Sequence, residues 1–265
     1  FLEKNKSAIQ IAGSDPQEIK RTINILNRID IIKHVNFNLG CPSSRVQENM
    51  LGLALTQNYD LVKKCLFELI NYKHEVSVKC RLGLGMNEDK NYIFSYLNLF
   101  KDIGIKKVFI HCRNGVLNLD TKKNRTIPQI NYELFIECSN KFPKMELIPN
   151  GEVNDLETFN SFKSKNINKY MIGRHFTKDA LFLEKLKLEK INDKTSLVLD
   201  SIKELDNYKY LNINLLKKSL FTLINNISNS KGIKKDILKI GKRFDKNWSP
   251  FPKITLGLII IEFFN

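Results

Sequence analysis

Short runs rich in β-branched and apolar residues alternate with runs of helical periodicity from Ala8 to about Gly173, and this alternation restricts the fold most. It is typical of parallel β-α units, in which each strand is followed by a helix. It predicts strands at 8–11, 35–38, 76–80, 108–112, 146–148 and 169–172. It predicts helices at 16–28, 60–72, 91–103, 132–141 and 155–165. Crossovers of this length build either an open doubly wound sheet or a closed barrel.

The character of the chain changes after Arg174, where strand signals end and helical runs rich in Lys, Leu, Ile and Asn continue to about Lys242. The 265 residues, 42% of them hydrophobic, suffice for one large domain with a smaller appendage. We therefore expect an α/β domain at 1–182, a small all-α domain at 183–247 and a divergent tail at 248–265. The apolar run of the tail is too short to span a bilayer, so we expect no membrane partner. We also expect a monomer.

The chain is strongly basic, because 43 lysines and arginines against 28 acidic residues give a formal charge of +15. A polyanionic partner is the simplest interpretation, with nucleic acid ahead of a membrane surface. AT-rich coding, which favours Lys, Asn and Ile, is the alternative explanation of the same composition. The five cysteines form no close pair, which argues against a zinc site and a disulfide framework and indicates a reducing compartment.

Polar residues or glycines follow every predicted strand. In a parallel β-α fold these carboxyl ends meet on one face, where ligands bind. Each residue alone could be structural: a glutamine that satisfies a backbone group, a solvated lysine, a core histidine or a glycine in a tight turn. Together they predict a site for a polar planar ligand with a phosphate, formed by Gln10, Asn38, Cys41, Lys79, Arg81, His111, Arg113, Asn150, Gly151, Gly173 and Arg174.

Cys41 stands between Gly40 and Pro42, just after the predicted strand 35–38. An inert buried thiol more often lies inside an apolar run, so this position favours a thiol that reaches a ligand. The thiol could act as a nucleophile, although no thiol-protease signature accompanies it. It could also act as a general acid, because an unperturbed thiol is still protonated near neutral pH. The residues themselves leave both roles open.

Seven sequence blocks resemble the tRNA-dihydrouridine synthases of the DusA type in order and spacing, from about Ala8 to Phe182. They are IQIAGSDP, NFNLGCPSSRVQENMLG, VSVKCRLG, FIHCRNG, TKKNRTIP, IPNGEV and YMIGRHF. The resemblance implies a TIM (β/α)8-type barrel that carries FMN, followed by a helical tRNA-binding domain. It implies reduction of the C5=C6 bond of a D-loop uridine in tRNA, with NADPH as electron donor. Reduced flavin then gives hydride to C6, and Cys41 matches the cysteine that gives a proton to C5.

The resemblance also implies roles for single residues, each carried over by its match to a motif. The matches to flavin contacts are Gln10, Lys79 and His111, and those to the phosphate and ribityl surroundings are Asn150, Gly151, Glu152, Gly173 and Arg174. Glu152 replaces a glycine that is usual in the family, and we expect its carboxylate to repel the phosphate. The implied tRNA contacts are Asn38 beside the target base, then Arg113, Lys122, Arg125, Lys217 and Lys218.

The first two strands of the family's barrel have no counterpart here, since Phe1 comes just before the third, so we expect an N-terminally incomplete barrel. Two other functions stay open at this point. One is a small-molecule FMN oxidoreductase of the dihydroorotate dehydrogenase kind, and the other is a non-catalytic RNA-binding derivative. We expect the protein in the cytoplasm or in an organellar stroma or matrix.

Overall fold

The computed structural model describes residues 7–87, 89–175, 182, 231–232, 235 and 259–260. The chain divides into two compact units, of which the first comprises Phe1–Val153, Asn160–Met171 and Leu256–Asn265. The second comprises Asn154–Phe159 and Ile172–Thr255. Lys217 and Lys218, most of the predicted helical domain and most of the tail lie outside the described residues.

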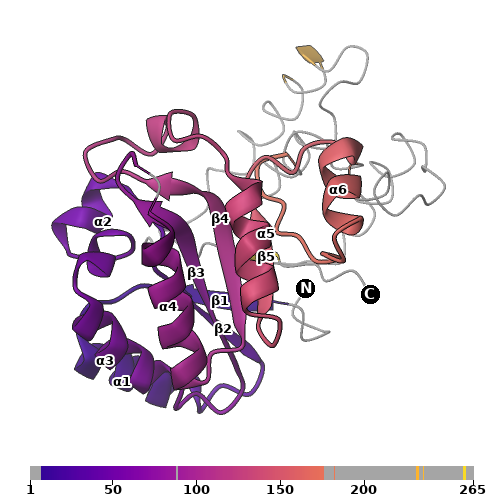
Figure 1. Cartoon of the computed structure of the whole chain (residues 1–265). Helices are drawn as coiled ribbons and strands as arrows, with labels where there is room; N and C mark the ends of the chain where they lie inside the picture. Colours follow the sequence, from indigo (N-terminus) through magenta and orange to yellow (C-terminus); the bar gives the residue numbers. More distant parts are fainter. Residues whose placement is uncertain are drawn as a thin grey trace. The chain divides into compact units, whose positions relative to one another are not determined.

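The sheet of the first unit contains five parallel strands that pair in chain order (Figure 1). They are β1 (Ser7–Ile11), β2 (His34–Asn38), β3 (Glu75–Leu84), β4 (Lys107–Gly115) and β5 (Glu146–Asn150). A two-residue strand, β6 (Ile259–Ile260), pairs antiparallel with β1. The order of the parallel strands does not reverse, as it would in a doubly wound sheet, so the sheet is part of a TIM-type barrel wall.

The sixth predicted strand, 169–172, is wrong as a strand. Only one bridge forms there, between Asn150 and Met171. The side-chain amide of Asn150 donates to the carbonyl of Met171 over 2.8 Å, while the backbone nitrogen of Met171 donates to Pro149. Because a side chain takes the carbonyl that a ladder would use, the pairing stops after one residue.

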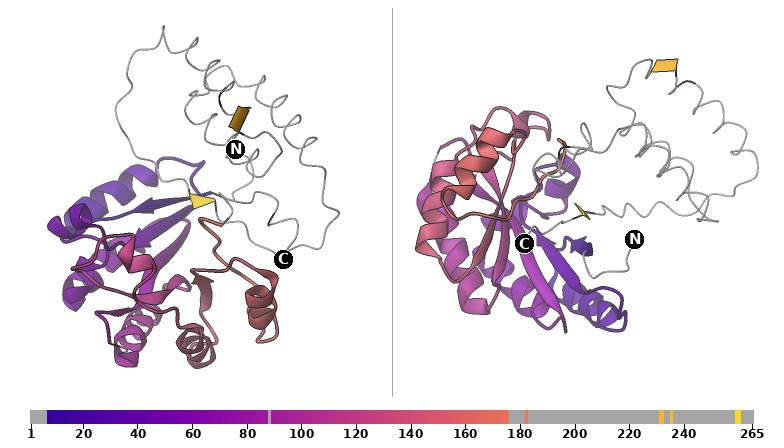
Figure 2. Two further views of the ribbon diagram at one scale, coloured as in Figure 1. Left: turned by 90° about the horizontal axis from the view of Figure 1, so that it is seen from above. Right: turned by 90° about the vertical axis from the view of Figure 1, so that its right-hand side faces the viewer.

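The helices confirm the α part of the pattern. They are α1 (Pro16–Leu26), α3 (Tyr59–Leu69), α4 (Lys90–Ile103), α5 (Tyr132–Lys141) and α6 (Leu156–Lys163), with the short helices α2 (Ser44–Glu48), η1 (Ala54–Gln57) and η2 (Lys123–Arg125). At the start of α1, α3, α4 and α5, a side-chain oxygen of the N-cap residue accepts a backbone N–H of the first turn. These N-cap residues are Asp15, Asn58, Asp89 and Asn131. Figures 1 and 2 show these four helices on one face of the sheet.

The two faces of the sheet differ in chemistry because successive strand residues point to opposite sides. The side that meets the helices is apolar and fully buried at positions such as Val35, Phe37, Val78, Val108 and Ile110. The opposite side has a small apolar cluster of Ala8, Phe109 and Ile148, against which Met171 packs. The remaining residues of that inner face are mostly polar.

No helix in the described part of the chain has the length and apolar character needed to cross a bilayer. Within those residues there is also no cluster of three or more histidine, cysteine or acidic side chains that could hold a metal ion.

Candidate functional site

Strand register brings the predicted polar residues together at the carboxyl ends of the strands. Asn38 on β2 lies opposite Lys79 on β3. Arg81, two residues further along β3, lies opposite His111 on β4, and His111 lies opposite Asn150 on β5. Four neighbouring strands therefore present a predicted site residue at the same edge.

The turn that carries Cys41 is held by the side chain of Asn38. The Oδ1 atom of Asn38 accepts hydrogen bonds from the backbone nitrogens of Gly40, at 3.0 Å, and Cys41, at 3.1 Å. On the other side, the carbonyl of Cys41 accepts from the backbone nitrogen of Leu53 over 3.0 Å. Gly52 has φ +58°, and a Cβ there would lie 2.8 Å from that same carbonyl, so only glycine fits. The backbone of Cys41 is fixed from both sides.

The thiol of Cys41 differs from the other four. It is half-buried, with Sγ 3.5 Å from the Oγ atom of Ser43. Cys65, Cys80, Cys112 and Cys138 are buried, and all five cysteines are unpaired thiols. Burial raises the pKa of Cys65 to about 11 and those of Cys80 and Cys138 to about 12. Cys41 is thus the one cysteine that a ligand at this edge of the sheet can meet.

Arg81 joins the Cys41 turn to the loop after β4. Its guanidinium donates to the carbonyls of Gly40 at 2.9 Å, Asn114 at 2.8 Å and Asn124 at 3.2 Å. The side chain is 3% exposed, and this burial lowers its pKa to about 10. The strand pattern places Arg81 at the ligand face but does not predict this role, because carbonyl partners leave no mark in a sequence.

Lys79 is a cation of the site without a partner among the residues that the structure describes. In the part of the chain that the structure describes, its ammonium makes no hydrogen bond or ion pair, although the side chain is half-buried. Burial, and then the neighbouring charge of Arg81, lower the pKa of Lys79 to about 8. An anionic group beside Lys79 would offset this desolvation.

His111 and Gly151 are in close contact at the end of β5. Gly151 has φ +111°, and a Cβ there would lie 2.7 Å from Cδ2 of His111 and 3.0 Å from its Nε2. The carbonyl of Gly151 accepts a hydrogen bond from the hydroxyl of Tyr132 over 2.7 Å. Glycine is required here both for its backbone conformation and for the space that the imidazole occupies.

Glu152 and Arg113 form an ion pair that bears on two of the expectations. The carboxylate of Glu152 pairs with the guanidinium of Arg113, which is 4% exposed and also donates to the carbonyl of Pro128. The charge of Glu152 is therefore compensated by Arg113, so the expected repulsion of a phosphate is reduced. The guanidinium of Arg113 is buried and bonded within the protein, which argues against the direct tRNA contact that the sequence suggests.

The remaining predicted residues divide into two groups. Lys122 and Arg125 are exposed on the loop after β4, whose shape depends on the fully buried Asn124. The side chain of Asn124 accepts from the nitrogen of Val116 and donates to its carbonyl. Gly173 and Arg174 follow the bridge residue Met171 in the chain and belong to the second compact unit.

Comparisons with known proteins identify the family of this chain. The family model described as dihydrouridine synthase (Dus) matches residues 1–244. A tRNA-dihydrouridine(20/20a) synthase of Pasteurella multocida strain Pm70 is 30% identical over 173 residues, which are 64% of this chain and 52% of the relative. Proteins of the same name from Yersinia pestis and Synechocystis sp. are 28% identical over 202 residues and 29% identical over 174. These stretches cover 75% and 65% of this chain, and 58% and 52% of the relatives. The chain thus spans about half the length of the curated relatives it matches.

Proposed function

The chain belongs to the dihydrouridine synthase family, and we propose on this basis that it reduces a D-loop uridine of tRNA to 5,6-dihydrouridine. The names of its relatives support the choice of tRNA as substrate. The observation that carries the chemistry is Cys41: of five thiols it alone is partly exposed, on a turn fixed from both sides.

The residues at the carboxyl ends of the strands fit FMN, the cofactor that we propose. Lys79 offers an ammonium without a partner in the described chain, which suits the anionic ring of a reduced flavin. His111 on β4 and Gln10 on β1 are polar groups on the same inner face, and Asn150 and Gly151 lie at the end of β5. Gly173 and Arg174 are the proposed further contacts to the phosphate. When bound, FMN would supply the hydride that reduces C6, with NADPH as the source of electrons.

Cys41 would then supply the proton that C5 needs. The thiol must be protonated and must be held at one place, and the hydrogen bonds of Asn38 and Leu53 to its backbone provide the second condition. Asn38 lies beside this thiol and would face the target base. Because its Oδ1 already accepts two backbone N–H groups, Asn38 can offer the base only an N–H donor, which suits a uracil carbonyl.

The charge of the chain supports the tRNA part of the proposal. A formal charge of +15 suits a phosphate-rich partner, and Lys122 and Arg125 present exposed cations on the loop after β4. Lys217 and Lys218, outside the described residues, are further proposed contacts within the helical domain at 183–247. The buried Arg81 connects the loop of Lys122 and Arg125 with the Cys41 turn.

The test is to incubate the chain with unmodified tRNA transcript, FMN and NADPH and to measure dihydrouridine in the digested RNA by mass spectrometry. The proposal expects dihydrouridine at a D-loop position, dependent on both NADPH and FMN. It expects tRNA binding that weakens steeply with salt. Reduction of a free pyrimidine base without any effect of tRNA would support the small-molecule oxidoreductase instead. Salt-dependent tRNA binding without flavin binding or reduction would support the non-catalytic derivative.

A further inference from the structure

The hydrogen bonds around the Cys41 turn continue through the inside of the barrel wall. The two backbone N–H groups of Gly40 and Cys41 can only donate, so the atom of Asn38 that receives them must be its oxygen. The amide nitrogen of Asn38 therefore points the other way, to the side-chain oxygen of Gln10 at 3.2 Å. The orientation of Gln10 is fixed in turn, because its oxygen must face Asn38.

The side-chain orientations are fixed in the same way as far as β3. With its oxygen toward Asn38, Gln10 turns its amide nitrogen to the oxygen of Asn36 at 2.6 Å. Asn36 must then direct its own nitrogen to the Oγ atom of Ser77, at 2.7 Å. Asn36 and Ser77 are buried, with 3% and 0% of their surface exposed, so both side chains are shielded from bulk water.

The hydrogen bond between Ser77 and His34 determines which ring nitrogen of His34 carries the proton. The Oγ atom of Ser77 accepts from Asn36, so its one hydrogen is free to donate to Nε2 of His34, which lies 2.6 Å away. A nitrogen that accepts this bond carries no proton, and the proton of the neutral imidazole is consequently on Nδ1. Nδ1 faces the carboxylate of Glu75 at 3.6 Å.

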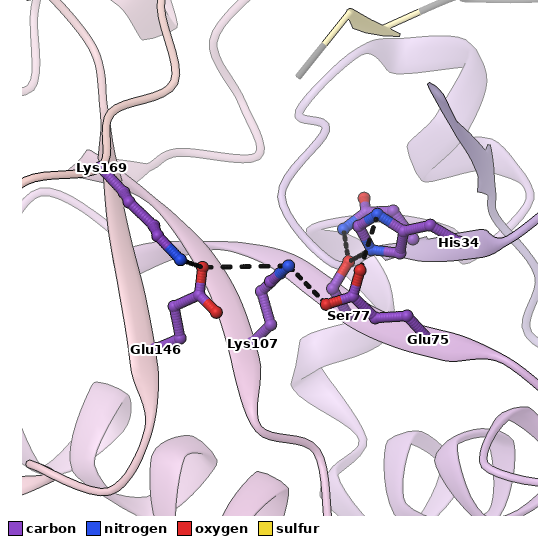
Figure 3. A network of polar contacts seen from close by, with 7 residues as sticks. His34, Glu75, Ser77, Lys107, Glu146 and Lys169 are labelled. Atoms are coloured by element: carbon purple, nitrogen blue, oxygen red, sulfur yellow. Dashed lines mark hydrogen bonds and ion pairs between the residues drawn. The ribbon is translucent and has the colours of Figure 1, made fainter. Parts of the chain in front are cut away.

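Glu75, at the amino-terminal edge of the sheet, is the last side chain in this succession of polar contacts. Figure 3 shows its carboxylate between His34 and the ammonium of Lys107, and Lys107 also lies 3.8 Å from Glu146. Burial lowers the pKa of His34 to about 4, which keeps the imidazole neutral near pH 7. A neutral imidazole between a hydroxyl donor and a carboxylate has only one favourable tautomer here.

We propose that His34, Ser77 and Asn36 are positioning residues in a directed relay from Glu75 to Asn38 that fixes the turn of Cys41. The relay begins with an electrostatic contact between Glu75 and His34 and continues from His34 onward by hydrogen bonds. The relay is defined as Glu75, His34, Ser77, Asn36, Gln10 and Asn38. Its role in catalysis rests on the proposed function of Cys41, whereas its effect on the turn does not. None of the first four residues needs to touch a ligand for this role.

The direction of the relay is tested by the imidazole ¹⁵N resonances of His34 in the labelled full chain, assigned with His34→Gln. The proposal expects the proton on Nδ1 and an unprotonated Nε2 at neutral pH. A proton on Nε2 would overturn it, because Ser77 could then no longer donate to the ring. This measurement needs only the wild-type fold and neither flavin nor tRNA.

The effect on the turn is tested by the rate at which N-ethylmaleimide alkylates Cys41, the one partly exposed thiol. Ser77→Ala and His34→Leu break the relay and should speed alkylation about fivefold, the factor that loss of a hydrogen bond of about 1 kcal/mol produces. His34→Gln places an amide oxygen near Ser77 and should restore the wild-type rate. Val35→Ala is the matched control, because it opens a cavity on the same strand but on the opposite face.

Alkylation rates of Ser77→Ala and His34→Leu that equal that of Val35→Ala would overturn the relay. The same variants should lower kcat for dihydrouridine formation more than they raise KM for tRNA. If alkylation and the ¹⁵N resonances behave as expected while no variant or wild-type chain forms dihydrouridine, the relay stands and the proposed function fails. The two failures are therefore distinguishable.

Discussion

The Oδ1 atom of Asn38 lies 3.1 Å from the backbone nitrogen of Cys41 and accepts its hydrogen bond. Asn38→Ala removes this acceptor, and with it the bond from Gly40, and leaves two half-buried N–H groups unpaired. We expect a loss of about 2 kcal/mol in the free energy of unfolding. Asn49→Ala is the control: Asn49 is exposed and makes one local bond to Arg45, so its loss should be within about 0.5 kcal/mol. Urea titration measures both, and equal losses would show that the turn does not depend on Asn38.

Gly151→Ala should be costly because of the contact with His111. The new Cβ would lie 2.7 Å from the ring and would require an alanine at φ +111°. Gly85→Ala is a matched control, since Gly85 has φ +93° and nothing lies within 4 Å of its Cβ position. We expect a loss of about 1 kcal/mol for Gly85→Ala, from backbone strain alone, and of about 3 kcal/mol for Gly151→Ala. Equal losses of unfolding free energy for Gly151→Ala and Gly85→Ala would mean that the imidazole of His111 moves aside without cost. FMN affinity, measured by fluorescence quenching, should fall only for Gly151→Ala.

Glu152→Gln should destabilise the chain because it leaves the buried guanidinium of Arg113 without its anion. Glu152 is itself 40% exposed, which reduces the effect, and we expect a loss of about 2 kcal/mol in the free energy of unfolding. The control is Glu18→Gln, which removes an ion pair with Arg21 in which both side chains are 64% exposed. That loss should stay within about 0.5 kcal/mol. A Glu152→Gln chain as stable as Glu18→Gln would contradict the structural importance of the pair.

The stability of the folded chain should depend on His34 below neutral pH. Its pKa in the folded chain is about 4, against 6.5 for an ordinary histidine, because burial disfavours the charged ring. The groups that face it are Ser77, Glu75, Lys107 and, further away, Glu146. The stabilisation is fully present above pH 6.5 and is lost as the pH falls toward 4, because only the unfolded chain gains the proton.

A pKa difference of this size corresponds to at most about 3 kcal/mol. Thermal unfolding at several pH values should therefore show a smaller loss between pH 6.5 and 4 for His34→Gln than for the wild type. Identical pH dependence of the two chains would indicate that the pKa of His34 in the folded chain equals that of an ordinary histidine.

Much of the fold follows from the alternation of strand and helix patterns, because each pattern is local. The predicted helix at 132–141 coincides with α5, and Asp15 caps α1 by accepting the backbone N–H of Gln17. The sixth strand failed for a reason that no local pattern contains. Whether Met171 extends a ladder depends on which group takes its carbonyl, and that group is the side chain of Asn150.

The site was predictable as a set of residues but not as a set of contacts. Lys79, His111, Asn38 and Cys41 do come to the same edge of the sheet, as the parallel pattern requires. The pairing of Arg113 with Glu152 was missed because the two residues are distant in sequence. The sequence does contain a feature that indicates the relay. Asn36 and Ser77 are polar residues inside the otherwise apolar strands HVNFN and EVSVK.

The role of Cys41 is tested most directly by Cys41→Ala, assayed with FMN, NADPH and unmodified tRNA transcript beside the wild type. The alanine removes only the sulfur, so the variant should bind FMN with wild-type affinity and keep its visible absorbance. Dihydrouridine formation in a single turnover should fall at least about 100-fold, as expected for loss of a general acid. Turnover of Cys41→Ala at the wild-type rate, with FMN bound equally in both chains, would contradict the account.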